Sequence, residues 1–191
     1  MRMKLRLLAI VALFSFATPL AAQGAPDEPT VAVEIGDDGI VVDRPSLWKV
    51  GFMRGPTILR YFIGAGDGFP NFTAMSDREA ALDPDTRPDR VHDAVDELFA
   101  TISVNDEIIE AGWTAINGIE VYSSLAIRDS VAGRIQRRRL LLVHKGVPYI
   151  LVWAHYAERY SEVEALIEQC VKSLKLGHGP GRIAAAMTHA R

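Results

Sequence analysis

The chain has 191 residues, with 21 Lys and Arg against 24 Asp and Glu, so its formal net charge at pH 7 is −3. This mildly acidic balance argues against nucleic acid as the main partner, because phosphate binding needs clustered positive charge. Cys170 is the only cysteine, so no internal disulfide can form, and we expect this thiol to be a small buried hydrophobe.

The N-terminus has the layout of a secretory signal peptide. Arg2, Lys4 and Arg6 precede an apolar run from Leu7 to Phe16, and small residues follow. The run is too short for a membrane helix, which needs about 20 apolar residues. We therefore predict a signal peptide over residues 1–22 and, since no cysteine lies near the cleavage point, a product that is periplasmic or secreted and not lipid-anchored. Its removal leaves 18 basic and 24 acidic side chains, a formal charge of −6.

The mature chain begins with a leader and a hairpin. Residues 23–30 contain Gly, Pro and acids without periodicity, which is typical of a flexible leader. Thr30 to Ile35 and Gly39 to Asp43 are rich in Val and Ile and predict two paired strands. The acids between them, Asp37 and Asp38, favour a turn over a calcium loop, because the spaced oxygen ligands and the distant Glu of such a loop are missing.

A second pair of strands is predicted at Ile58–Ile63 and Asn71–Met75. The glycines between them, from Gly64 to Gly68, lack the Lys of a P-loop and the spacing of a dinucleotide fingerprint, so we interpret them as a hairpin loop. The charged segment Ser76–Asp89 contains two prolines and predicts a loop.

A helix is predicted after this loop, with Asp89 as its N-cap. Apolar residues recur at helical spacing and define one buried face: Val91, Val95, Leu98, Phe99 and Ile102. His92 and Asp96 stand four residues apart on the other side. A solvated face explains this pair better than a metal site, since two ligands do not close one.

The next segment predicts strands in quick succession. Ile108–Trp113 is followed by a connection whose Asn117-Gly118 dipeptide favours a tight turn. Ile119–Arg128 alternates apolar and polar residues, as a half-buried strand does. Leu140–Val143 is apolar at every position, so both faces of that strand should be covered.

The last hairpin has a register that follows from its turn. With Lys145-Gly146 as the turn, Arg138 lies opposite Trp153, and Gln136 opposite His155. His144 and His155 are then about 26 Å apart and cannot share a ligand. A guanidinium over an indole is a favourable pair, so we predict a modest binding surface at Arg138, Trp153 and His155. The run of three arginines at 137–139 alternates faces and does not form one contiguous patch.

A closing helix is predicted from Ser161, with Glu164 completing a capping box, and Gly177 ending it. Its apolar stripe includes Cys170, which favours a buried thiol. Residues 177–191 predict a mobile tail. Residues 31–176 are then a single domain.

The order of these elements resembles the PsbP-like superfamily, which includes the oxygen-evolving-enhancer proteins of photosystem II, Ran-binding Mog proteins and bacterial periplasmic DcrB-like proteins. The resemblance covers roughly residues 31–176 and rests on the motifs Pro45-Ser46-Leu47-Trp48, Ile116–Tyr122 and Lys145–Leu151 in that order. It implies an α/β/α sandwich with a central antiparallel sheet flanked by helices, and a non-enzymatic binding or assembly module. The charged insertion at 76–90 departs from that compact pattern.

No stretch spells out a catalytic, cofactor-binding or metal-binding signature. The leading hypothesis is an exported, non-enzymatic binding or accessory protein of the bacterial cell envelope, whose partner is an unknown protein or envelope component. One alternative is a small-ligand carrier with an apolar pocket near Tyr122, Tyr149 and Trp153. Another is a hydrolase or metal-dependent enzyme whose site assembles around His92, His144 or His155 only in the fold.

Overall fold

The computed structural model describes residues 28–53, 55, 57–64, 68–83 and 85–177. The predicted signal peptide, most of the leader and nearly all of the predicted tail lie outside these residues, so those assignments stay predictions. Across the described part of the chain, the helices are too short or too polar to cross a bilayer.

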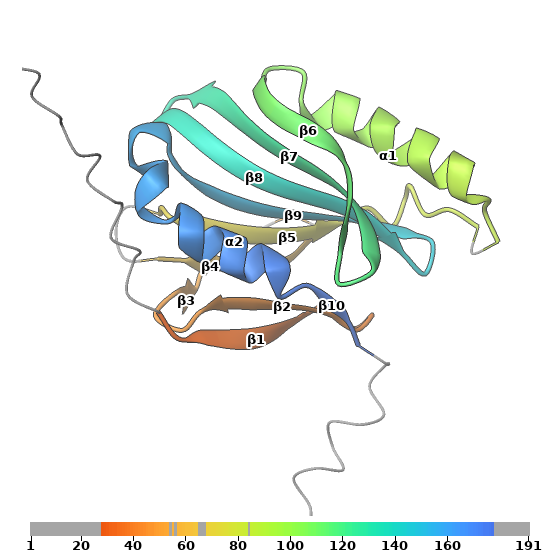
Figure 1. Ribbon diagram of the computed structural model, residues 1–191, viewed down its shortest axis with the longest axis horizontal. Helices are drawn as coiled ribbons and strands as arrows, with labels where there is room; N and C mark the ends of the chain where they lie inside the picture. Colours follow the sequence, from red (N-terminus) through yellow and green to blue (C-terminus); the bar gives the residue numbers. More distant parts are fainter. Residues whose placement is uncertain (1–27, 54, 56, 65–67, 84, 178–191) are drawn as a thin grey trace, which may run out of the picture.

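The centre of the fold is a seven-stranded antiparallel sheet in the order β3-β4-β5-β9-β8-β7-β6 (Figure 1). Its strands are β3 (Lys49–Val50), β4 (Ile58–Ile63), β5 (Asn71–Ser76), β6 (Glu107–Ile116), β7 (Ile119–Ser130), β8 (Gly133–His144) and β9 (Val147–Tyr156). The strands from β6 to β9 are joined by tight turns, and Asn117 and Lys145 have positive φ as the predicted turns require. The predicted β8–β9 register is confirmed, including Arg138 opposite Trp153 and Gln136 opposite His155.

The predicted N-terminal hairpin belongs to a second sheet. Its strands, β1 (Thr30–Ile35) and β2 (Ile40–Pro45), pair as expected, and β2 also pairs with the short strand β10 (Lys175–Leu176). Gly177 therefore does not end a helix. Its backbone N–H donates to the carbonyl of Gly39, which holds the end of the domain against the hairpin turn.

In the described ranges, the remaining elements are two helices, α1 (Pro88–Ile102) and α2 (Glu164–Lys172), and one 3-10 turn (Ala157–Glu162). Helix α1 covers one face of the large sheet, while α2 and the small sheet cover the other (Figure 1). The expected α/β/α sandwich is thus correct only in part. One of its outer layers is shared between a nine-residue helix and three strands, and the fold is dominated by antiparallel sheet.

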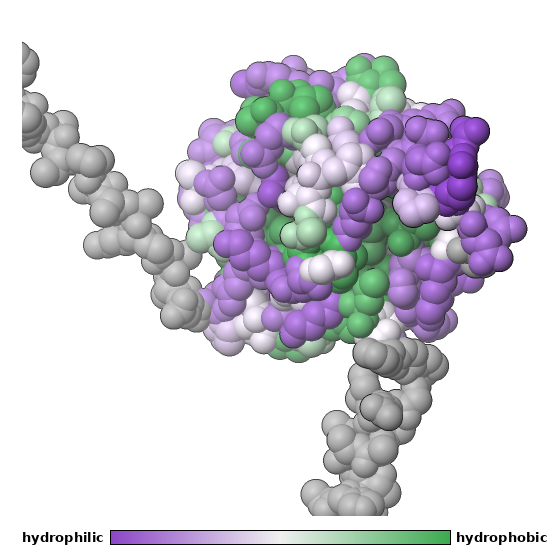
Figure 2. Space-filling view, turned by 45° about the vertical axis from the view of Figure 1, so that its right-hand side comes forward, coloured by the Kyte–Doolittle hydropathy of each residue, from purple (hydrophilic) through white to green (hydrophobic). Residues whose placement is uncertain are grey.

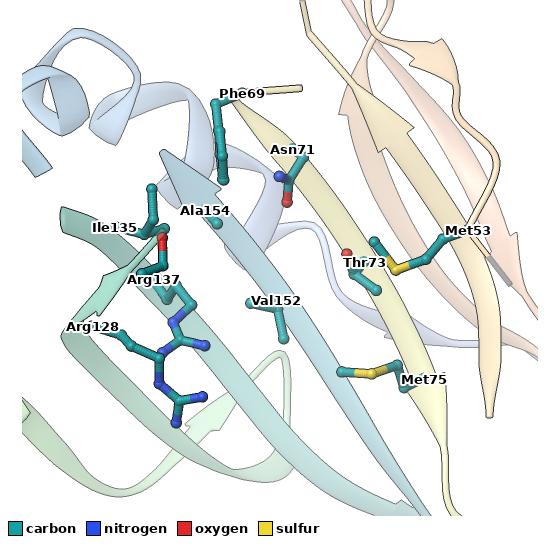
Figure 3. A pocket seen from close by; sticks show the side chains of 11 residues that line it. Met53, Phe69, Asn71, Thr73, Met75, Arg128, Ile135, Arg137, Val152 and Ala154 are labelled. Atoms are coloured by element: carbon teal, nitrogen blue, oxygen red, sulfur yellow. The ribbon is translucent and has the colours of Figure 1, made fainter. Parts of the chain in front are cut away.

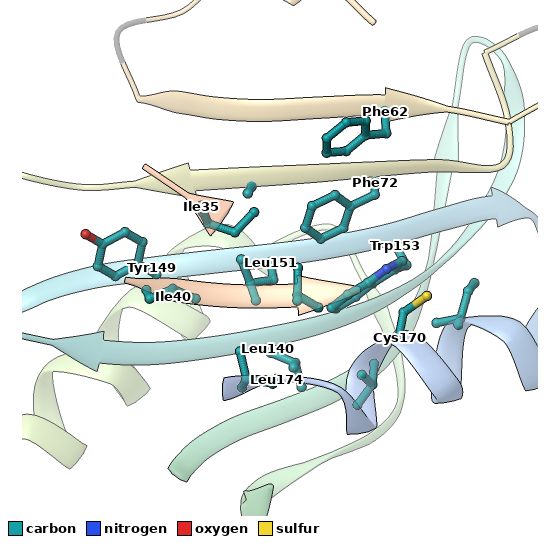
Figure 4. Packing of buried hydrophobic residues seen from close by; sticks show 14 of the residues in the cluster. Ile35, Ile40, Phe62, Phe72, Leu140, Tyr149, Leu151, Trp153, Cys170 and Leu174 are labelled. Atoms are coloured by element: carbon teal, nitrogen blue, oxygen red, sulfur yellow. The ribbon is translucent and has the colours of Figure 1, made fainter. Parts of the chain in front are cut away.

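The main core lies between the large sheet and the layer formed by α2 and the small sheet (Figure 4). Phe72, Tyr149, Leu151 and Trp153 point into it from β5 and β9, and Cys170 meets them from α2. A smaller cluster on the opposite face packs Val95 of α1 against the sheet. Burial on both faces confirms the expectation for Leu140–Val143, where Leu140, Leu141 and Leu142 are all buried.

Both predicted helix starts are wrong. Helix α1 begins at Pro88, with Arg87 at the N-cap and no side-chain cap bond, because proline is well suited to the first turn and displaces the expected Asp89 cap. The second helix begins at Glu164 after Val163 and has no capping box. Its predicted first turn is a 3-10 turn instead, which continues directly from β9.

Hydrophilic residues cover much of the surface seen in Figure 2, and hydrophobic residues gather in separate areas of it. The exposed large hydrophobic residues include Leu47, Val50 and Phe52 near β3, and Ile108 and Ile109 on the edge strand β6.

Candidate functional site

Two of the three residues of the predicted binding surface, Trp153 and His155, are buried, whereas Arg138 is partly exposed. Trp153 and His155 are each 1% exposed, because both face the core layer that α2 and the small sheet cover. Arg138 forms ion pairs with Glu110 and Glu168. Two hollows of about 260 and 300 Å³ lie beside Arg138. Its charge is matched there by two carboxylates, and a binding role for these residues stays a prediction.

The three histidines considered for an enzyme lie in different surroundings. His92 pairs with Glu120 at 2.9 Å and stacks on Trp113. The Nε2 of His144 lies 2.9 Å from the carbonyl oxygen of Asp38. Burial, reinforced by the positive charge of Arg159, lowers the pKa of His155, whose Nδ1 has no hydrogen-bond partner among the described residues. Within the described ranges, no group of three or more metal-ligating side chains is close enough to hold an ion.

A different site emerges on the α1 face of the sheet. Alternate residues of β8 point to this face, and they change character along the strand. Leu141 and Val143 are apolar and pack under α1. Arg139 follows, with its guanidinium 5.7 Å from the ring centre of Phe99 near the end of α1. Arg137 and Ile135 then lie beyond the helix. The strand thus carries apolar residues under the helix and cations where the helix ends.

Helix length explains why the sheet is left open there. The 15 residues of α1 span about 22 Å at 1.5 Å each, whereas the 12 residues of β8 span about 40 Å at 3.3 Å each. The helix therefore cannot cover the whole length of the strand. The uncovered part is the floor of a pocket.

This sheet-face pocket has a volume of about 360 Å³ (Figure 3). It spans four neighbouring strands and is lined by Met53, Phe69, Asn71, Thr73, Met75, Arg128, Ser130, Ile135, Arg137, Val152 and Ala154. The guanidinium groups of Arg128 and Arg137 lie close together on one side, and Met53 and Met75 lie across from them (Figure 3). The lining is mostly apolar and carries its charge at one side only.

The turn after α1 supplies the counter-charge. Asp106 follows the helix, and its side chain is 0% exposed. Its Oδ1 accepts from Arg128 Nε and from Arg137 Nη2, each at 2.6 Å, and its Oδ2 accepts from Arg139. Arg128 also donates to the carbonyl of Ile102 at the C-terminal end of α1, at 2.8 Å, where the helix dipole favours a cation.

We call these four side chains the arginine cluster: Arg128, Arg137, Arg139 and Asp106. Three guanidinium groups share one carboxylate, so the cluster has a formal charge of +2 in a protein that is acidic overall. Burial, with further contributions from the neighbouring cations Arg128 and Arg139, lowers the pKa of Arg137 to about 10, against the opposing pull of Asp106. Arg137 remains charged at neutral pH. Its Nε is buried and has no hydrogen-bond partner in the described part of the chain.

Part of this cluster was accessible to sequence reasoning. Arg137 and Arg139 stand two residues apart in a strand, which places both on one face, opposite to Arg138. The β7–β8 register then places Arg128 opposite Ile135, which is two residues before Arg137 and on the same face of β8. Asp106, in contrast, reaches the cluster from a turn, and no periodicity indicates its direction.

Comparison with known proteins gives a match in structure but not in sequence. Neither a family model nor a curated protein matches the chain. The solution structure of cyanobacterial PsbP from Synechocystis sp. PCC 6803 is similar, with a TM-score of 0.57 and 16% identity, over 83% of this chain and 99% of that one.

Two further structures are similar at 11% identity. One is a protein from Bacteroides thetaiotaomicron VPI-5482, with a TM-score of 0.50 over 73% of this chain and 46% of that one. The other is LpqN, involved in cell envelope biogenesis of Mycobacterium tuberculosis, with a TM-score of 0.48 over 78% of this chain and 91% of that one. The resemblance stated from the order of motifs is confirmed at the level of architecture, and this chain has the PsbP-like fold.

Proposed function

We propose that this protein is an exported, non-enzymatic binding or accessory protein of the bacterial cell envelope, and that it binds its ligand in the sheet-face pocket. The pocket is the observation that carries this proposal. It is open, its volume of about 360 Å³ lies within the usual range of about 300 to 1,000 Å³ for small-molecule sites, and it combines an apolar lining with a few polar groups. Export rests on the N-terminal sequence pattern.

The chemistry of the lining supports binding over catalysis. The charged side chains among its described residues are Arg128 and Arg137, and an arginine is too basic to act as a general base at neutral pH. The hydroxyl of Ser130 lines the pocket and donates to the carbonyl of Gly133 at 3.0 Å. Among the lining residues that the structure describes there is neither a histidine nor a carboxylate, so none of them places a base beside this hydroxyl.

The small-ligand carrier hypothesis requires a different binding site from the aromatic residues first considered for it. Tyr149 and Trp153 are buried in the main core, whereas Tyr122 packs against Phe99 and Trp113 on the opposite face of the sheet. These aromatic residues therefore do not enclose a common pocket. A small ligand would lie in the sheet-face pocket, past the end of α1.

Export is tested by expressing the full chain with its own N-terminus in a bacterial host and measuring intact masses in each cell fraction. We expect a periplasmic species that is shorter by about 22 residues. A full-length species confined to the cytoplasm would contradict the export part of the proposal.

Binding is tested by native mass spectrometry of the protein purified from that host. We expect an adduct that disappears on denaturation and is absent from Ala154→Phe, which places a large ring in the pocket. Ala100→Phe, at an exposed position of α1, is the matched control and should keep the adduct. Equal adducts in both variants, or none in the wild type, would count against ligand binding in the pocket.

A further inference from the structure

We propose that the ligand of the sheet-face pocket is an amphipathic organic anion, whose carboxylate or phosphate group binds to Arg128 and Arg137 while its apolar body lies along β5 and β9. This inference rests on the proposed function and names its ligand class. It follows from the charge of the arginine cluster, from the position of that charge in the pocket, and from the lining opposite to it.

The charge is the first argument. Asp106 neutralises one of three guanidinium groups, and the C-terminal end of α1 contributes only a partial negative charge, about half an elementary charge, near Arg128. More than one positive charge of the cluster thus remains without a formal counter-ion from the described residues. Cations brought together without full compensation repel one another, and an added anion relieves that repulsion.

The arrangement of the donors is the second argument. Arg128 and Arg137 both line the pocket, with exposed side-chain fractions of 31% and 19%, so each is partly open to solvent and partly fixed. Asp106 holds both guanidinium groups, since each donates to the same carboxylate oxygen. Two fixed guanidinium groups side by side suit an oxyanion with several acceptor oxygens. Arg137 Nε is a buried donor that still has no partner among the described residues.

The lining away from the arginines is the third argument. Met75, Val152 and Ala154 form the floor on β5 and β9, and Met53 lies across the pocket from the arginine pair (Figure 3). Methionine side chains adapt to irregular apolar shapes. An inorganic anion would leave this surface in water, whereas an anion with an apolar body would cover it.

The hollows beside Arg138 do not compete for such a ligand. Arg138 is already paired with Glu110 and Glu168, and Lys172 also lines one of these hollows, so the formal charges there balance. Charge therefore distinguishes the two faces of the sheet: it is balanced near Arg138, whereas the arginine cluster on the α1 side has an excess of positive charge.

The probes are octanoate, octyl phosphate, octanol and acetate. Those that form micelles are used below their critical micelle concentration. Backbone amide shifts of the isotope-labelled mature protein are followed on titration. We expect octanoate or octyl phosphate to shift the amides of Thr73, Val152 and Ala154, and to bind at least about tenfold more tightly than octanol or acetate. Whichever of the two anions binds more tightly identifies the head group.

The matched variants are Arg137→Gln and Arg134→Gln, which remove the same charge. Arg137→Gln leaves Asp106 with two guanidinium partners, so the fold should persist, and it should weaken octanoate or octyl phosphate by about 10- to 100-fold. Arg134 is exposed, pairs with Glu107 and Asp129 and does not line the pocket, so its variant should bind as the wild type does. Arg128→Gln gives the same test should Arg137→Gln fail to fold.

Four outcomes would each overturn a part or the whole of this inference, and the adduct measurement tests the proposed function separately. Octanol binding as tightly as octanoate, at the same amides, would overturn the anionic ligand and leave pocket binding intact. Acetate binding as tightly as octanoate would overturn the apolar body. Shifts confined to residues around Arg138 would overturn the assigned site, and no binding by any probe would overturn the inference while the adduct measurement decides the proposed function.

Discussion

Replacing Asp106 with asparagine removes the one carboxylate that three guanidinium groups share. The Asp106 side chain is 0% exposed, and Arg139, at 3%, cannot turn to solvent without leaving its packing on Phe99. Breaking a buried ion pair by removing one partner costs about 3 to 5 kcal/mol, because the remaining charge is buried without compensation. Arg128 is more exposed and can re-solvate, so it should add little to that cost.

We therefore expect Asp106→Asn to lower the free energy of unfolding by about 3 to 5 kcal/mol, or the melting temperature by roughly 10 °C. Urea unfolding followed by the fluorescence of the three tryptophans measures the change. Asp129→Asn is the control, since Asp129 is 86% exposed in its pair with Arg134 and should change stability by less than about 0.5 kcal/mol.

A loss below about 1 kcal/mol for Asp106→Asn would refute the reasoning, because the cluster would then be solvated well enough not to need its carboxylate. A second variant separates charge from packing. Adding Arg139→Met to Asp106→Asn removes the most buried cation while keeping an unbranched side chain against Phe99, and should recover part of the lost stability. Additive losses in the double variant would argue that Asp106 and Arg139 stabilise the fold independently of each other.

Three further predictions concern the rest of the fold. Burial raises the pKa of Cys170 to about 12, so about one thiol in ten thousand should be ionised at pH 8, and a disulfide reagent should label it only after denaturation. Burial lowers the pKa of His155, so below about pH 6.5 the unfolded state binds a proton that the folded state does not bind. The free energy of unfolding should therefore decrease as the pH is lowered, by up to about 1.4 kcal/mol per pH unit, and less steeply in His155→Gln. Tyr149 donates to the carboxylate of Asp38, and Tyr149→Phe should cost about 1 to 2 kcal/mol by urea unfolding.

Each of these has its own contrary result. Rapid labelling of the native thiol at pH 8 would show that α2 opens readily. An unchanged pH slope in His155→Gln would assign the acid sensitivity to other groups. A double-mutant cycle of Tyr149→Phe with Asp38→Asn should return most of the single-variant loss as interaction energy, and a value near zero would mean that the two groups act independently.

The sequence predicted best the structural features that depend on residues close together in the chain. Lys145-Gly146 fixes the register of β8 and β9 because a two-residue turn leaves one pairing, and all of the predicted cross-strand pairs are confirmed. The apolar stripe of α2 was found for the same reason, since helical spacing is local. Helix starts were predicted less well. Pro88 and the 3-10 turn after β9 override the capping residues at Asp89 and Ser161.

The candidate site lay beyond such local rules. The predicted surface at Arg138, Trp153 and His155 follows correctly from the register, but register does not reveal which face another layer will cover. The site's position depends on α1 being shorter than β8, and its charge depends on Asp106 turning inward after the helix. Both features depend on the tertiary structure, and neither helical nor strand periodicity in the sequence predicts them.

The pairing of β10 with β2 has a consequence for how the molecule assembles. Strand β2 is built from residues 40–45 and its partner from residues 175–176, so the small sheet joins segments separated by most of the domain. Ser173 adds to this seam by accepting the backbone N–H of Asp43 at 2.7 Å. Contacts so distant in sequence form late, because the loop between them must close first. The N-terminal hairpin, although synthesised before the rest of the domain, can complete its sheet only after β10 has been synthesised.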